Sequence, residues 1–303
     1  MIPLDITTIV LTYNEERHIA RCIVNALSFS KKVIVIDSPS TDRTQEICKS
    51  FPNVEVVEHK YPGNQAAQFN WALDNVKVDT EWILRLDADE YLSDELIEEL
   101  QNKIPQMPSD ITGCVMKRDV VIMGKRIKHG KLKQPKFLRL WRSGKGRIEN
   151  RVMDEHAILT EGRSVEMKHF FYDENLNGIE AWVKKHLDYA NREVSVYSNG
   201  LNQAGAEMGS RNNQKTKYYS LPKYHRGFWF FILRYIFLGG FLDGKAGFVW
   251  NFMQCWWYRT LVDVMIEDKE QAVWGGAIHR IELRPESSEL VLCCALLERR
   301  VAA

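Results

Sequence analysis

The sequence predicts an α/β fold. A mostly parallel, Rossmann-like sheet carries helices on both faces and is followed by a C-terminal helical region. Continuous apolar runs alternate with segments of helical periodicity through the first hundred residues. Strands that are buried on both faces, as in a parallel sheet, have such uninterrupted apolar sequences. A concentration of aromatic residues at 218–258 marks the separate C-terminal region.

Each element has its own pattern. ITTIVLTY is a continuous apolar run, whereas EERHIARCIVNALSF has apolar residues at three- and four-residue spacing. The second helix should begin at Ser40 or Thr41, because both residues are favoured helix caps. The predicted order is strand 6–13, helix 15–29, strand 32–37, helix 40–51, strand 54–59, helix 64–76 and strand 81–87.

Composition limits the protein class. A chain of 303 residues is long enough for one large domain or two. The formal net charge of +1 gives the whole molecule no strong attraction to polyanions. None of the six cysteines forms a Cys-x-x-Cys pair, which favours a reduced, cytosolic compartment. The first residues lack the pattern of a signal peptide, so none is expected.

Polar residues follow the predicted strands. In parallel sheets, ligands bind beyond the carboxyl ends of the strands. The sequence therefore predicts one binding site at this edge, although separate solvated loops would give the same pattern. The residues are Tyr13, Asn14 and Glu15 after the first strand, Asp37 after the second, and Asp87 and Asp89 after the fourth.

The stretch LRLDADEYLSDELIEEL, residues 84–100, contains two groups of acids that need different explanations. Ser93 can cap a helix that begins at Asp94, and this accounts for the acids near the helix start. It does not account for Asp87 and Asp89, which would point to one side of an extended chain. Two adjacent carboxylates repel each other unless a cation lies between them, and oxygen ligands favour Mn2+ or Mg2+. No Gly-x-Gly-x-x-Gly or P-loop pattern is present to bind phosphates instead.

TTIVLTYNEERHIARCI, KVIVIDSPSTDRT and WILRLDADEYL together resemble the nucleotide-sugar half of family 2 glycosyltransferases. The resemblance covers roughly residues 5–105 and implies the glycosyltransferase-A fold, a UDP-sugar donor and inversion at the anomeric carbon. It implies that Tyr13 to Glu15 and Asp37 bind the base and ribose, and that Asp87 and Asp89 belong to the metal–diphosphate motif. Some relatives carry a basic residue in the helix before this motif. Here Gln65, Gln68 and Asn70 would have to act by hydrogen bonding.

Residues 117–147 form a strongly basic run in which Asp119 is the only acid. Nucleic acid is one candidate partner, but no nucleic-acid motif accompanies the run. A phosphate-bearing acceptor or an anionic membrane surface fits better, and a solvated basic face is the alternative. The twelve cations are Lys117, Arg118, Lys125, Arg126, Lys128, Lys131, Lys133, Lys136, Arg139, Arg142, Lys145 and Arg147.

MDEHA places Asp154, Glu155 and His156 side by side. Glycosyl transfer needs a base for the acceptor hydroxyl, so either carboxylate is a candidate. The region resembles a bacterial subgroup of lipopolysaccharide-core and exopolysaccharide enzymes, in which a lone histidine follows, here His169. The resemblance makes His156 and His169 candidate metal or diphosphate ligands, and structural histidines are the alternative.

Residues 218–258 are unusually aromatic. The apolar stretch 227–242 is short for a membrane span and contains Arg234. Helices lying in a membrane interface are therefore expected, with a buried core or an oligomer interface as the alternative. The expected division is 1–110 for nucleotide-sugar binding, 111–215 for acceptor binding and catalysis, 216–270 for membrane-associating helices, and 271–303 for a tail of unknown role.

These features together predict a metal-dependent inverting glycosyltransferase. It would move a sugar from a nucleotide-sugar donor to a lipid-linked saccharide at the cytoplasmic face of the inner membrane, in bacterial surface polysaccharide or lipopolysaccharide synthesis. A nucleotidyltransferase is one alternative, although it favours a glycine-rich basic first loop where this chain has TYNEER. An inactive, membrane-bound saccharide-binding module is another, and the intact Asp87, Asp89 and Asp154 argue against it. Self-association of the chain is left open.

Overall fold

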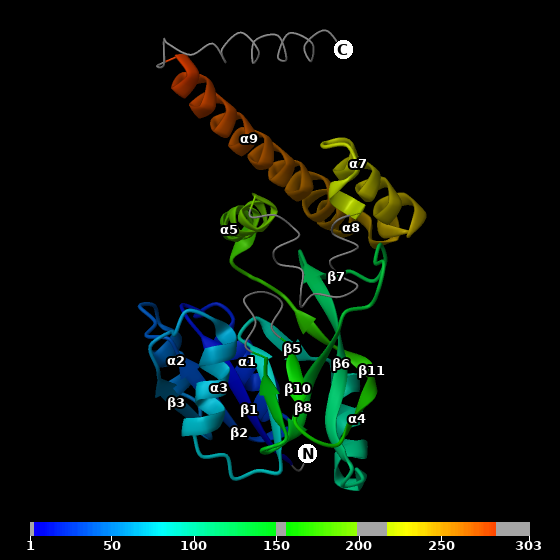
Figure 1. Ribbon diagram of the computed structural model, residues 1–303. Helices are drawn as coiled ribbons and strands as arrows, with labels where there is room; N and C mark the ends of the chain where they lie inside the picture. Colours follow the sequence, from blue (N-terminus) through cyan, green and yellow to red (C-terminus); the bar gives the residue numbers. More distant parts are fainter. Residues whose placement is uncertain (1–2, 150–155, 199–216, 283–303) are drawn as a thin grey trace. The chain divides into compact units, whose positions relative to one another are not determined.

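The computed structural model describes residues 3–149, 156–198 and 217–282. The chain divides into two compact units (Figure 1). Unit 1 consists of Met1–Glu180 and Arg234–Trp250. Unit 2 consists of Ala181–Leu233 and Asn251–Ala303.

Unit 1 holds the sheet and the helices that cover it (Figure 1). Its strands are β1 (Leu4–Thr12), β2 (Ser30–Asp37), β3 (Val54–Glu58), β4 (Trp82–Asp87), β5 (Glu90–Leu92), β6 (Ile111–Ile122), β7 (Lys125–Arg126), β8 (Lys136–Arg142), β9 (Gly146–Ile148), β10 (Ala157–Leu159) and β11 (Arg163–Asp173). Its helices are α1 (Ile19–Leu27), α2 (Thr44–Lys49), α3 (Gln65–Asn75), α4 (Asp94–Lys103) and most of α8 (Gly244–Asn251), with short 3-10 turns at Ile104–Gln106 and Gly240–Asp243.

The α/β fold class predicted from the sequence is confirmed. Among the described residues the main sheet has the order β3-β2-β1-β4-β8-β6-β11-β5, with β7 paired to β6. The four N-terminal strands are all parallel, as their continuous apolar sequences predict. The second half is mixed, because β8 runs antiparallel to both β4 and β6 whereas β11 runs parallel to β6.

Alternation along the strands builds a core on each face of the sheet. On β2, Val33 and Val35 join the cluster that α1 and α4 cover, whereas Ile34 and Ile36 join the cluster that α3 covers through Phe69. Because a strand directs successive side chains to opposite faces, both faces need helices. This two-sided burial holds the strand ends rigidly at one edge.

The predicted elements are found near their predicted positions, with one difference at the second helix. This helix, α2, begins at Thr44 and not at Ser40 or Thr41. Ser40 and Thr41 hydrogen-bond to Asp37 and Asn14 instead of capping a helix. The Ser93 cap of α4 is confirmed, since its side chain accepts from the Leu96 amide.

Unit 2 contains helices that precede and follow Arg234–Trp250 in the sequence. They are most of α5 (Gly178–Ser198), α7 (His225–Ile232), a π-helical turn (Phe252–Trp257) and α9 (Tyr258–Glu282). Ala190, Val194 and Val262 are in its apolar core. A buried ion pair joins Arg226 to Asp263 through an Nε–Oδ1 bond of 2.9 Å.

The aromatic segment of the sequence is divided between the two units. Tyr258 and Phe231 are buried in unit 2, whereas Phe237 in unit 1 is 76% exposed. In the described part of the chain no single helix is long and apolar enough to cross a membrane. The helices His225–Phe237 and Gly240–Gln271 meet that criterion only as a bent pair.

Candidate functional site

The carboxyl ends of the parallel strands meet at one edge of unit 1. Thr12 at the end of β1 pairs in register with Asp37 at the end of β2. On the other side of β1, Leu11 pairs with Asp87 at the end of β4. The three strand ends are therefore level, and the residues that follow them gather in one place, as the sequence predicts.

Asp37 is fully buried and organises the loop that follows β2. Its carboxylate accepts from the Thr12 hydroxyl at 2.8 Å, the Ser40 amide at 2.9 Å, the Ser40 hydroxyl at 2.6 Å and the Gln45 amide group at 2.8 Å. A carboxylate has about four acceptor positions, so these protein groups use them. In the structure Asp37 shapes the binding loop from beneath, and direct reading of a ligand by its carboxylate stays a prediction.

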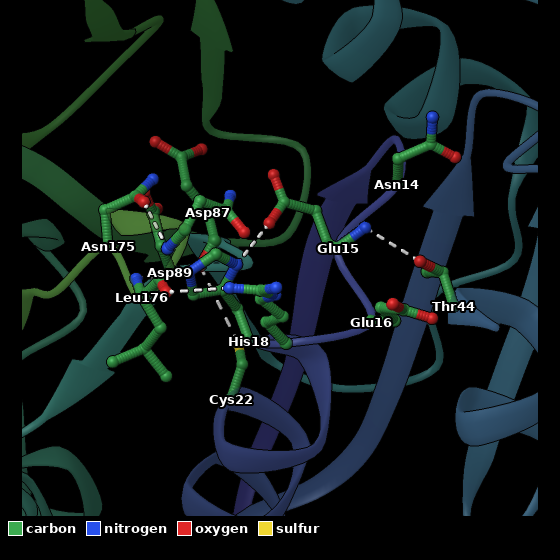
Figure 2. A network of polar contacts seen from close by, with 12 residues as sticks. Asn14, Glu15, Glu16, His18, Cys22, Thr44, Asp87, Asp89, Asn175 and Leu176 are labelled. Carbon is green, nitrogen blue, oxygen red and sulfur yellow. Dashed lines mark hydrogen bonds and ion pairs between the residues drawn. The ribbon is translucent and has the colours of Figure 1, made fainter. Parts of the chain in front are cut away.

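The loop after β1 is joined to this second loop by a row of hydrogen bonds. Asn14 takes a left-handed backbone conformation with φ 56°, which asparagine tolerates better than most residues. Its side chain accepts from the Thr41 amide at 2.8 Å, and its own amide donates to the Ser40 hydroxyl at 2.9 Å. The Glu15 amide donates to the Thr44 hydroxyl at 2.8 Å (Figure 2). Glu15 is therefore held at the edge of the sheet.

Asp87 and Asp89 lie on a tight turn, not on the extended chain that the sequence suggested. β4 ends at Asp87, the chain turns through Ala88 and Asp89, and β5 starts at Glu90. Both acids are half-buried and close to the loop after β1 (Figure 2). The backbone carbonyl of Asp89 accepts from the Glu174 amide at 3.0 Å, which fixes the turn from outside the motif.

Two buried arginines lie beside Asp87, although the sequence did not place either at this site and counted Arg139 only in the basic run. Arg85 is 3.8 Å and Arg139 3.6 Å from its carboxylate oxygens. Arg139 also donates to the buried Glu90 at 2.6 Å, and Glu90 accepts from the Asp87 amide at 3.0 Å. Burial raises the pKa of the Glu90 carboxyl, and the neighbouring Arg139 opposes that rise. An arginine inside an apolar strand, as in WILRLD and FLRLW, was the available signal.

The segment after β11 is a second contribution that the sequence did not reveal. Arg21 donates to the Glu174 carboxylate at 2.5 Å and to the Asp89 carbonyl at 3.3 Å. Buried His18 links two segments. Its Nδ1 lies 2.6 Å from the Glu15 carboxylate, and its Nε2 accepts from the Leu176 amide at 2.7 Å. These bonds hold residues 174–177 against the start of α1 and the Asp89 turn (Figure 2). The only sequence signal of this segment is the polar run DENLN at 173–177.

The remaining predicted donor-binding residues have different surroundings. Tyr13 is 61% exposed directly after β1, and Gln65 is exposed on the first turn of α3. Gln68 is buried and bonds to His59 and to the Ser38 hydroxyl. The Asn70 side chain both donates to and accepts from the backbone of Ile148. Tyr13 and Gln65 are therefore accessible to a ligand, whereas Gln68 and Asn70 hold the fold together.

The two histidines predicted as ligands have described positions, whereas the predicted base does not. Asp154 and Glu155 lie outside the described residues. His169 lies on β11, where its amide donates to Glu99 of α4 at 3.1 Å. Its position is five residues, or about 16 Å of strand, from Glu174. Half-buried His156 accepts from the Glu149 amide through its carbonyl. The assigned ligand roles of both histidines stay predictions.

Asp87 and Asp89 fit a divalent cation by the chemistry of their oxygen atoms. Mg2+ is commonly held by one or two carboxylates together with substrate phosphates and water. Among the described residues no group of three or more histidine, cysteine, aspartate or glutamate side chains could hold a metal ion.

The buried Arg139–Glu90 pair gives a stability prediction. Arg139→Met should lower the free energy of unfolding by about 3 kcal/mol, because it leaves a buried carboxylate without its cation. Urea unfolding followed by tryptophan fluorescence measures this. Arg147→Met is the control, since its ion pair with Asp74 is exposed and should contribute under about 1 kcal/mol. Equal losses in the two variants would contradict the prediction, and adding Glu90→Gln to Arg139→Met should restore part of the loss.

Comparison with known proteins adds to this geometry. Residues 7–163, more than half of the chain, match the family model of glycosyl transferase family 2. The lipopolysaccharide core biosynthesis glycosyltransferase LpsC of Rhizobium meliloti is 28% identical over 167 residues, covering 54% of this chain and 60% of that protein. An uncharacterized glycosyltransferase of Rickettsia typhi is 35% identical over 98 residues, covering 32% of each chain. The chain thus spans less than two thirds of the length of these relatives.

A crystal structure of S. aureus TarS 1-349 gives a TM-score of 0.42 at 17% identity, covering 88% of this chain and 91% of that one.

Proposed function

Because the chain belongs to glycosyl transferase family 2, we propose that it transfers a sugar from a nucleotide-sugar donor to a saccharide acceptor. The observation that supports this most is the level edge of unit 1. Two joined loops and the Asp87–Asp89 turn meet there within the region that matches the family. A donor bound at this edge would have its nucleotide over β1 and β2 and its diphosphate beside β4.

Tyr13 and the loop after β2 would bind the nucleotide. The Tyr13 ring is exposed and offers a flat aromatic face on which a base can stack. Asp37 supports this loop through its bonds to Ser40 and Gln45, so its contribution is to hold the loop in shape. Gln65, exposed on the first turn of α3, is available to hydrogen-bond the donor.

Asp89, assisted by Asp87, would hold Mn2+ or Mg2+ against the donor diphosphate. Such an ion, when bound, neutralises negative charge that develops on the departing nucleotide. Arg85 and Arg139 lie beside Asp87 and fix its carboxylate. Arg21 and Glu174 fix the backbone at Asp89, so the ligands are positioned before the donor arrives.

For the acceptor side, we propose that Asp154 or Glu155 takes the proton of the attacking hydroxyl, with inversion at the sugar carbon. We propose a lipid-linked saccharide as the acceptor and the cytoplasmic face of a membrane as the place of reaction. The name of the Rhizobium relative, which refers to lipopolysaccharide core biosynthesis, supports this acceptor class.

A donor screen tests the proposal. The purified chain is incubated with individual nucleotide sugars and Mn2+ or Mg2+, and release of free nucleoside diphosphate is measured. We expect slow metal-dependent hydrolysis of one or a few UDP-sugars. Absence of binding and hydrolysis with every donor, in protein shown to be folded, would contradict it. Release of pyrophosphate from a nucleoside triphosphate and a sugar phosphate would instead identify a nucleotidyltransferase.

Asp37→Ala should weaken UDP binding, because the loop that it supports would lose four hydrogen bonds. The same loss should lower the free energy of unfolding by about 2 kcal/mol or more. Calorimetric titration with UDP, at a temperature where the variant remains folded, measures the affinity. Asp42→Asn is a nearby comparison, since half-buried Asp42 accepts from the amides of Glu16 and Thr44. Equal UDP affinity in Asp37→Ala and the parent would contradict the prediction.

A further inference from the structure

Unit 1 carries an exposed apolar surface at residues 236–248, which we call the apolar tip. Phe237 is 76% exposed and Leu242 is 58% exposed. Exposed large apolar side chains that cluster in one short segment mark an interaction surface more often than scattered ones do. Its members are Ile236, Phe237, Phe241, Leu242 and Phe248.

The apolar tip is fastened to the loop after β7. Buried Asp243 accepts from the amides of Lys128 and His129 at 2.9 and 2.8 Å, and from the His129 ring at 2.9 Å. Gly130 donates to the Leu238 carbonyl at 2.9 Å and accepts from the Arg234 side chain at 2.5 Å. These contacts hold the tip and the loop as one surface within unit 1.

The loop supplies positive charge to this surface. Of the twelve cations in 117–147, nine form ion pairs with acids in the described part of the chain. The other three, Lys125, Lys128 and Lys133, are exposed and have no ion pair among the described residues. Exposed Lys245 adds a fourth cation from α8. The only acid in 121–137 and 234–250 is Asp243, which is buried.

We propose that the apolar tip and these four lysines form one docking surface for an anionic lipid membrane. Aromatic and aliphatic side chains enter the interface of a bilayer, while lysines beside them contact acidic headgroups. Nucleic acid would use the charge but not the apolar tip. A second copy would bring two positively charged surfaces together without a matching acid. This surface deepens the proposed function, because it would bring the donor site to a membrane-borne acceptor.

Vesicle sedimentation tests the docking surface independently of sugar transfer. The full chain is mixed with phosphatidylcholine vesicles that contain or lack phosphatidylglycerol, at low and high salt. We expect strong binding only with phosphatidylglycerol, weakened by salt because headgroup attraction is screened. Folded parent protein that binds neither kind of vesicle would overturn the proposal.

Two sets of variants separate charge from apolar insertion. Lys125→Ala, Lys128→Ala and Lys245→Ala together should weaken binding about a hundredfold, or about fivefold for each lysine. The control replaces three other lysines, by Lys49→Ala, Lys60→Ala and Lys77→Ala, and should leave binding within a few-fold of the parent.

Phe237→Ser with Phe241→Ser tests the apolar tip and should weaken binding about tenfold or more. Val24→Ser on α1 is its control, since Val24 is 59% exposed but far from the tip in sequence. Equal binding of the Phe237→Ser/Phe241→Ser variant and the parent would overturn the role of the tip. A change of oligomeric state by light scattering, with vesicle binding unchanged, would instead assign the tip to a second copy. UDP affinity is measured in parallel. Vesicle binding without UDP binding would contradict the proposed function and leave the docking surface standing.

Discussion

Asp89→Asn should lower metal-supported turnover of the nucleotide-sugar donor by about a hundredfold or more. The amide keeps the size of the side chain and removes its negative charge. Because the Asp89 backbone carbonyl is bound by Glu174 and Arg21, the turn should keep its shape in the variant. The loss would therefore come from weaker cation binding and not from a displaced motif.

Two measurements check this expectation. Turnover is compared with and without excess chelator, and calorimetry compares UDP affinity with and without Mn2+. In the parent, Mn2+ should strengthen UDP binding, and in Asp89→Asn this strengthening should largely disappear. Asp94→Asn is the matched control, because Asp94 is an exposed acid on the first turn of α4. Unchanged turnover of Asp89→Asn, or full activity of the parent in chelator, would reject the metal role.

Loss of the catalytic base should have a comparably large effect on transfer. Either Asp154→Asn or Glu155→Gln is expected to reduce transfer to the acceptor by about a hundredfold to ten-thousandfold. The base acts only as the acceptor oxygen attacks, so donor binding should remain near the parental value. This separation distinguishes a base from a residue that merely supports the fold.

The experiment compares both single variants in one transfer assay with a calorimetric UDP titration. One variant should lose transfer and the other should serve as its neighbouring control. If Asp154→Asn and Glu155→Gln both keep the parental transfer rate, neither carboxylate is the base. His156 is then the first residue to replace, because it stands next to both in the sequence.

Local patterns predicted the parallel half of unit 1 well. Strands such as KVIVID have a continuous apolar centre, and their burial on both faces is typical of a parallel sheet. The polar residues after these strands therefore gathered at one edge as predicted. The start of α2 was misplaced because Asp37 competes for Ser40, and this hydrogen bond depends on tertiary structure.

Local patterns could not show which distant residues support the acids. Arg139 and Glu174 are 50 and 85 residues beyond Asp89 in the sequence, and only the pairing of β8 and β11 in the mixed half brings them close. Gln68 shows how burial bears on a prediction that stays untested. Its place in the helix before the motif suggested ligand binding, whereas burial beside His59 gives its amide a packing role.

The path of the chain between the units has a consequence for synthesis on the ribosome. The chain leaves unit 1 after Glu180, returns at Arg234 and leaves again after Trp250. Domains generally fold as their residues emerge, from the N-terminus onward. The sheet can form early, but Lys128 and His129 must wait for Asp243, more than 110 residues later. A nascent chain released before that point would expose an incomplete unit 1, with its basic loop unanchored, to proteases and chaperones.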